Sequence, residues 1–219
     1  MKNIHELEDD LRERWLKSYP DDERKAFCFD GLCYNGEIYN DGKNAHQGNE
    51  EKLWNNTDRR ILFLMKDTNN NSDSDYREWH WRNINHNFFN CIFKWLEGLS
   101  RISKDFIPTM ENGDYATVPN AVVTKYPLAI VNIKKISGTS FVSNKTLYEY
   151  ANRDKAFLQE QIRGILHPNI IVCGGGKGTV LNIAKNIIYE DESFREINYF
   201  CHYSRKLNIL LIDSFHPSA

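Results

Sequence analysis

Four polar segments of the chain each follow a run of apolar residues, three of them directly and the last after three intervening residues. They supply a carboxylic acid, an amide, a glycine turn and a histidine, in the order Lys66-Asp67-Thr68-Asn69, Asn132, Gly174-Gly175-Gly176-Lys177 and His216-Pro217-Ser218. A carboxylate can stabilise positive charge or orient a water molecule, an amide both donates and accepts hydrogen bonds, and a histidine can donate toward developing negative charge. If these segments meet, they have the residue types of an acid–base and electrostatic site.

The apolar runs that precede these segments predict strands at residues 61–65, 128–131, 170–173 and 207–212. The first run is apolar throughout, which is typical of a strand buried on both faces of a parallel sheet. Stretches with helical spacing of apolar residues predict helices at residues 76–99, 146–166 and 179–189. Strands that alternate with helices at these lengths imply an α/β fold of three layers (α/β/α), with a central, mostly parallel four-stranded sheet.

In an open parallel sheet, functional loops gather at the carboxyl ends of the strands. We therefore expect Asp67, Asn132 and His216 to meet at one edge of the sheet, around the glycine turn. Each residue alone also has a structural interpretation. Asp67 can form a turn or cap a helix, Asn132 can satisfy local backbone groups, and His216 can belong to a turn. Only their convergence favours a functional site.

The length of 219 residues favours a single domain, residues 1–219. Residues 4–18 have the spacing of an amphipathic surface helix. Residues 30–58 are rich in Gly, Asn and Asp, a composition typical of turns rather than packed elements. We therefore expect residues 1–58 to form an N-terminal helix and a loop-rich extension of the domain.

The composition narrows the possible partners and the compartment. The net charge is -2, from 28 basic and 30 acidic residues, which excludes a uniformly basic surface that binds nucleic acid by bulk charge. Residues 134–185 carry a local excess of basic residues. The N-terminus lacks the apolar core of a signal peptide, no apolar run is long enough for a membrane span, and the five cysteines form no disulfide pattern. We expect a cytoplasmic monomer without a membrane partner.

Several common sites are disfavoured by spacing. The glycine turn fits neither the phosphate-binding P-loop, because Lys177 is followed by Gly178, nor the dinucleotide pattern, because Thr179 replaces the third glycine. The pair Cys28 and Cys33 lacks a second pair at zinc spacing, and no serine lies in a nucleophile elbow. We therefore expect neither a cofactor nor a metal.

The ordered strand ends resemble the motifs of the uracil-DNA glycosylase superfamily. In that family an apolar strand leads into Gly-Gln-Asp-Pro-Tyr, a second ends in Asn, a third ends in a glycine-containing turn, and His-Pro-Ser follows the last. The matching stretches here are residues 61–69, 128–132, 170–174 and 216–218, and the resemblance spans about residues 60–219. Only His-Pro-Ser is matched literally.

The resemblance implies hydrolysis of the N-glycosidic bond of a deaminated base in single- or double-stranded DNA, or binding of a related nucleotide. Asp67 would stabilise the sugar cation and orient water, and His216 would stabilise the departing base. Asn132 would read the edge of a flipped uracil and reject cytosine. The other expected substrate contacts are Lys66, Thr68, Asn69, Phe88 as a base-stacking aromatic, Gly174, Gly175 and Ser218.

Departures from the family pattern leave two other functions open. Lys66 stands in place of Gln, and Thr68-Asn69 replaces Pro-Tyr, so the aromatic side chain that screens out thymine is missing from its usual position. These changes favour a module that binds nucleic acid or a nucleotide without cleaving it. The aromatic-rich stretch from Trp79 to Trp95 would instead suit an interaction protein, with these side chains on a partner surface.

Overall fold

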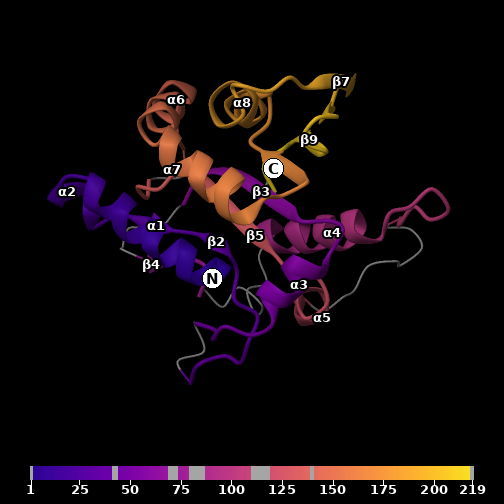
Figure 1. Cartoon of the computed structure of the whole chain (residues 1–219), viewed down its shortest axis with the longest axis horizontal. Coiled ribbons are helices and arrows are strands. Elements are labelled where there is room, and N and C mark those ends of the chain that lie inside the picture. The colour runs from indigo at the N-terminus through magenta and orange to yellow at the C-terminus, as the bar shows by residue number, and fades with distance from the viewer. Residues whose placement is uncertain are drawn as a thin grey trace.

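A computed structural model of the chain describes residues 2–40, 44–68, 74–78, 87–109, 119–138 and 141–217. Its strands are β1 (Cys28–Phe29), β2 (Gly31–Leu32), β3 (Ile61–Asp67), β4 (Ser74–Asp75), β5 (Ala129–Lys134), β6 (Ile170–Gly174), β7 (Arg195–Asn198), β8 (Cys201–Ser204) and β9 (Ile209–Ser214). Its helices are α1 (Ile4–Ser18), α2 (Asp21–Arg24), α3 (Glu50–Asn56), α4 (Asn87–Arg101), α5 (Pro119–Val123), α6 (Asn144–Arg153), α7 (Lys155–Gln159), η2 (Glu160–Leu166), α8 (Thr179–Ile183) and η3 (Ala184–Ile188). Figure 1 shows their arrangement.

The central sheet is mixed and mostly parallel. Its strand order is β2-β5-β3-β6-β9-β8-β7, and the four inner strands β5, β3, β6 and β9 run parallel to one another. These are the four strands expected from the apolar runs. The expectation of a four-stranded sheet is wrong, because β2 pairs antiparallel with β5 and the β7–β8 hairpin pairs antiparallel with β9. All residues of β7 are exposed, so it lacks the apolar pattern by which a strand is recognised.

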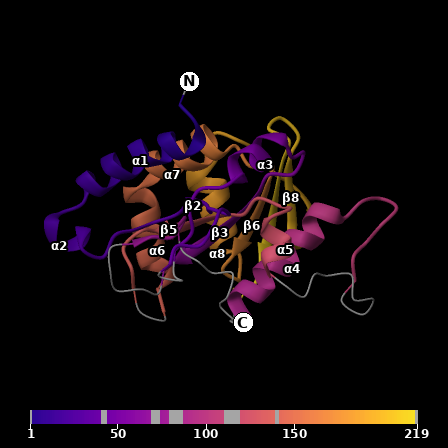
Figure 2. The same ribbon diagram turned by 90° about the horizontal axis from the view of Figure 1, so that it is seen from below.

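Helices cover both faces of this sheet, an arrangement compatible with three layers (Figure 2). The side chains of β3 alternate between the two faces, as strand geometry requires. Leu62 and Leu64 pack into the core formed with α1, α6, α7 and α8, whereas Phe63 and Met65 pack against α4 and α5. Both sets are buried, which explains why β3 is apolar throughout.

The N-terminal part of the chain packs into this core. Trp15 of α1 is fully buried, and β2 forms one edge of the central sheet. Residues 30–58, which we expect to be loop-rich, include the short elements β2 and α3, and Trp54 of α3 is buried. Both elements are short, so they contribute few apolar residues to a sequence pattern. Among the described helices, none combines the length and apolar character needed to cross a membrane.

A buried ion pair fastens α1 to α3 and gives a pH-dependent stability. The His5 ring donates to Glu50 at 2.8 Å, and Glu8 lies 3.8 Å away, so their charges outweigh the desolvation by burial and raise the pKa of His5 to about 9. Because the pKa of His5 is higher in the folded state than in the unfolded state, its protonation stabilises the fold at pH values below the unfolded-state pKa. This stabilisation is lost as the pH rises through the folded-state pKa. We expect the unfolding free energy to fall by about 3 kcal/mol between pH 6.5 and pH 9 through this group.

Urea unfolding across this pH range measures the effect. The variant His5→Gln should lose most of the slope, and His167→Gln, which changes an exposed histidine, should keep it. An equal slope in wild type and His5→Gln would contradict the assignment.

Candidate active site at the carboxyl edge of the sheet

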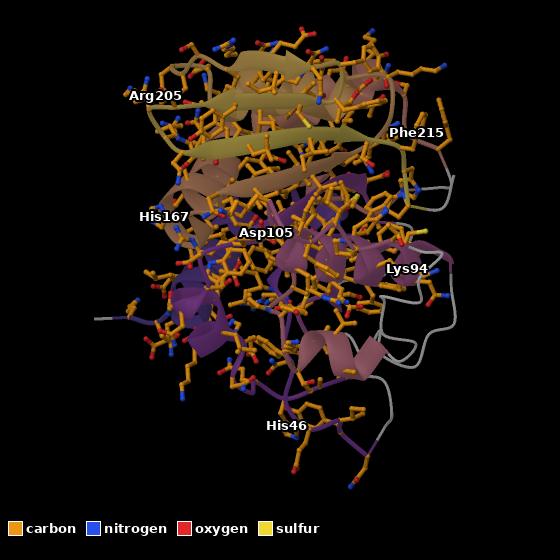
Figure 3. All side chains as sticks on the ribbon, turned by 90° about the vertical axis from the view of Figure 1, so that its right-hand side faces the viewer. His46, Lys94, Asp105, His167, Arg205 and Phe215 are labelled. Carbon is orange, nitrogen blue, oxygen red and sulfur yellow. The ribbon has the colours of Figure 1, made fainter. Side chains whose placement is uncertain are left out.

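The structure brings the ends of the four parallel strands together at one edge of the sheet. In the strand register, Met65 of β3 lies opposite Asn132 of β5 on one side and Gly174 of β6 on the other. Gly174 in turn lies opposite Ser214 of β9. Figure 3 shows Phe215 on this side of the molecule, and His167 and Arg205 on the opposite side. The edge therefore collects residues from four distant parts of the chain.

Asp67 is the last residue of β3 and forms an ion pair with Lys134. The two residues lie opposite each other in the register of β3 and β5, with 3.5 Å between Asp67 Oδ2 and Lys134 Nζ. Burial raises the pKa of Asp67, and the positive charges of Lys134 and Lys66 oppose that rise. Lys134 also donates to the Ile136 carbonyl oxygen. Asp67 is thus a mostly buried carboxylate whose charge depends on neighbouring lysines.

His216 lies on the same side of the molecule as Asp67. Partial burial lowers the pKa of His216, and the positive charge of Lys66 lowers it further. Because Lys66 also acts on the pKa of Asp67, one ammonium group influences both residues. The ring of His216 lies 5.5 Å, centroid to centroid, from that of Phe88 in α4. At neutral pH this position favours an uncharged imidazole that can donate one hydrogen bond.

The backbone of the glycine turn packs closely against neighbouring residues, and its first amide groups are hydrogen-bonded within the fold. A Cβ atom on Gly174 would collide with the Met65 sulfur, and Pro217 lies just beyond at 3.7 Å from the same position. The N–H groups of Gly175 and Gly176 donate to the Ser214 carbonyl oxygen at 3.2 and 2.8 Å. These two amides are therefore already used within the fold, and they join β9 to the turn after β6.

Asn132 lies inside β5, two residues before its end, and is held by Asp30. Its main-chain N–H and its side-chain Nδ2 both donate to Asp30 Oδ2, each at 3.0 Å. The other carboxylate oxygen of Asp30 accepts from Lys135. All three residues are buried. The Asn132 amide is therefore held in a fixed position.

The remaining expected contacts are placed as follows. The Lys66 side chain lies against the glycine turn, where a Cβ on Gly175 would come within 3.0 Å of its Cε. Thr68 is buried, and its carbonyl oxygen accepts from Gly138 at 3.1 Å. Asn69 and Ser218 lie outside the described residues, as do Trp79 and the start of the aromatic stretch.

An apolar hollow of about 300 Å³ lies on the α4 face of the sheet, between α4 and the strands β6 and β9. Its walls include Trp95 and Leu99 of α4, Val172 of β6, and Ile212 and Ser214 of β9. Ser214 is two residues before His216 in sequence, but His216 itself does not line the hollow. Within the described ranges, no group of three or more His, Cys, Asp or Glu side chains is arranged to hold a metal ion.

Sequence reasoning missed three residues of this site: Asp30, Lys134 and Lys135. Asp30 lies far from the strand-end motifs in sequence, and the two lysines stand out only as part of the local basic excess at residues 134–185. The available signal was the pair of lysines at the end of the apolar stretch that begins at residue 128. Their acidic partners can be identified only when the alignment of β5 with its neighbouring strands is known.

The arrangement combines a buried carboxylate beside a lysine, a histidine of lowered pKa and an immobilised amide on one edge. Such a set can stabilise a cation, donate to a leaving group and read a hydrogen-bonding edge. No protein-family model matches the chain, and a search of curated proteins gives no match either.

Proposed function

We propose that the protein is an N-glycosylase that hydrolyses the bond between a deaminated base and its sugar in DNA. One observation carries the proposal: Asp67, Asn132 and His216 come from three strands to the same edge, where Lys66 acts electrostatically on both Asp67 and His216. The resemblance of the strand ends to the uracil-DNA glycosylase superfamily supports the same reaction.

The proposed reaction assigns one role to each side chain. As the N-glycosidic bond breaks, its electron pair leaves with the base and the sugar acquires oxocarbenium character. The Asp67 carboxylate stabilises that positive charge and orients the water whose oxygen bonds to the sugar carbon. His216 donates a hydrogen bond to the base carbonyl, where negative charge develops. The proton released by the water ends on the base or in solvent, so charge balances.

Release of uracil from DNA tests the proposal directly. Purified protein is incubated with single-stranded and double-stranded oligonucleotides that carry one uracil, and abasic sites are revealed by alkaline cleavage. We expect cleavage at the uracil position and none in the same oligonucleotide with thymine or cytosine there. Absence of cleavage in both strand forms would refute the proposed activity.

The Lys134–Asp67 ion pair predicts a shift in the pH dependence of this activity. Lys134 lowers the pKa of Asp67 against the effect of burial, so its removal raises that pKa further. Because the ionised carboxylate is the active form, Lys134→Met should move the acid limb of the kcat/KM profile to higher pH. Lys134→Arg keeps a positive charge and should restore most of the profile. Lys145→Met removes an exposed lysine and serves as the control. An unmoved acid limb in Lys134→Met would contradict the electrostatic role.

The same ion pair favours a second candidate function. Asp67 is mostly buried and already paired with Lys134, as would suit a carboxylate that holds the site together rather than one that reacts. In this case the edge binds a nucleotide or DNA without cleaving it. Binding without base release by the wild-type protein is the expected result for this alternative.

A further inference from the structure

The chain has a gap in its β-ladder next to Asn132, and the Asp30 carboxylate fills it. Phe27 forms a bridge with Ile136, and Gly31 pairs with Ile130, so residues 28–30 lie opposite residues 131–135. Regular antiparallel pairing cannot span this mismatch. Asp30 Oδ2 accepts the main-chain N–H of Asn132, taking the place of a carbonyl oxygen in the ladder.

Asp30 is itself held on every side by buried donors. Lys135 donates to its Oδ1, and Gln161 donates to its main-chain oxygen at 2.6 Å. Lys135 also donates to Gln161 Oε1 at 3.2 Å and lies 4.8 Å from the centre of the Trp15 ring. Burial raises the pKa of Asp30, while Lys135 and the two N–H groups of Asn132 oppose the rise. Both carboxylate oxygens face donors, an environment that hydrogen-bonds the ionised form.

This environment fixes which way the Asn132 amide points. A carboxylate only accepts hydrogen bonds, so the amide nitrogen, not its oxygen, must face Asp30. Asp30 Oδ2 also accepts the main-chain N–H of Asn132, so this oxygen lies on the main-chain side of the side-chain amide. It therefore accepts the Nδ2 proton that points back toward the main chain, away from Oδ1. The second N–H and Oδ1 then form a donor–acceptor edge directed away from Asp30. Within the described ranges, Oδ1 accepts no hydrogen bond.

We propose that Asp30 is a specificity-determining positioning residue, which locks the Asn132 amide so that it selects a base with adjacent C=O and N–H groups. The role rests on the proposed function, and its ligand class is the imide edge found in uracil. Cytosine presents an amino group beside a ring nitrogen that accepts. To pair with it, the amide must rotate by half a turn and place Oδ1 against the Asp30 carboxylate, where two acceptors repel.

The variant Asp30→Asn tests the lock because it retains shape and changes one acceptor. Lys135 still needs an acceptor, so the new amide oxygen faces Lys135 and the new NH₂ group faces Asn132. That donor favours the rotated form of the Asn132 amide. We expect the affinity ratio of free uracil over free cytosine to fall at least about tenfold. Asp21→Asn makes the same chemical change at an exposed carboxylate and should leave the ratio as in wild type.

Both bases are titrated into isotope-labelled protein, and binding is followed through chemical shifts. In the wild-type protein, the Asn132 side chain should give one NH₂ proton protected from exchange with solvent and one that is not. This second readout needs no variant, so it decides the question even if Asp30→Asn does not fold.

The lock would be overturned by an Asn132 amide with both protons exchanging equally fast, or by folded Asp30→Asn with an unchanged uracil-to-cytosine ratio. Wild type without any preference for uracil would also overturn it. A protected amide and a uracil preference without base release from DNA would leave the lock in place and refute only the glycosylase.

Discussion

Asp67→Asn is expected to reduce base release from uracil-containing DNA at least about 100-fold while the protein stays folded and binds DNA. The amide keeps the shape of the carboxylate but loses the negative charge that stabilises the sugar cation. It also loses its ionic attraction to Lys134, although the amide oxygen can still accept from that ammonium group. The measurement is the single-turnover rate of base release, with DNA affinity determined by fluorescence anisotropy.

Asp105→Asn changes an exposed carboxylate and is the matched control, with a rate expected to equal that of wild type. A variant Asp67→Asn that retains the wild-type rate would exclude Asp67 as the catalytic carboxylate. If neither wild type nor variant releases base but both bind DNA, the protein is a binding module. Absent DNA affinity would instead favour the interaction protein, since phosphate contacts make binding strong and salt-dependent.

Lys135→Met is expected to destabilise the fold by about 3–5 kcal/mol, because it leaves the Asp30 carboxylate buried without its counterion. Lys135 has no exposed surface, and its ammonium contacts Asp30 and Gln161. Methionine has a similar volume, so packing around Trp15 changes little. The loss therefore measures mainly the cost of an unpaired buried charge, and urea unfolding at neutral pH gives its size.

The double variant Asp30→Asn with Lys135→Met separates charge from packing, because the amide oxygen can still accept from the two N–H groups of Asn132. Removing both charges should restore part of the stability lost in Lys135→Met, because no ion then remains unpaired. Lys155→Met removes an ion pair near the surface and should cost less than about 1 kcal/mol. If replacing Asp30 lowered the unfolding free energy as much in Lys135→Met as it does in the wild-type protein, the ion-pair explanation would be wrong.

The sequence predicts the centre of this fold better than its edges. The parallel strands β3, β5, β6 and β9 appear as apolar runs because both faces of the sheet are covered, and burial on both faces is a local property of composition. The strands β2 and β7 are short or exposed, so their pairing depends on hydrogen bonds that leave no apolar pattern.

The site shows the same division. The position of Asp67 and His216 at this edge could be predicted because each comes after an apolar run, and strand ends gather at one edge whatever the register. Lys134 could not, because its contact with Asp67 requires the particular alignment of β3 with β5. The role of Asp30 could not be predicted either. Asp30 reaches Asn132 only because the segment that leads into β2 has fewer residues than the part of β5 opposite it. Such pairings are decided by the whole sheet rather than by neighbouring residues.

The hydrogen bonds around Asp30 join parts of the chain that are 102 to 131 residues apart in sequence. Long loops must close before such contacts form, and chains dominated by distant pairings have high contact order and fold slowly. Helices such as α1 can form early, but Lys135 can lose its hydration favourably only once Asp30 has arrived. We therefore expect the amide of Asn132 to become immobile only after these distant segments have met.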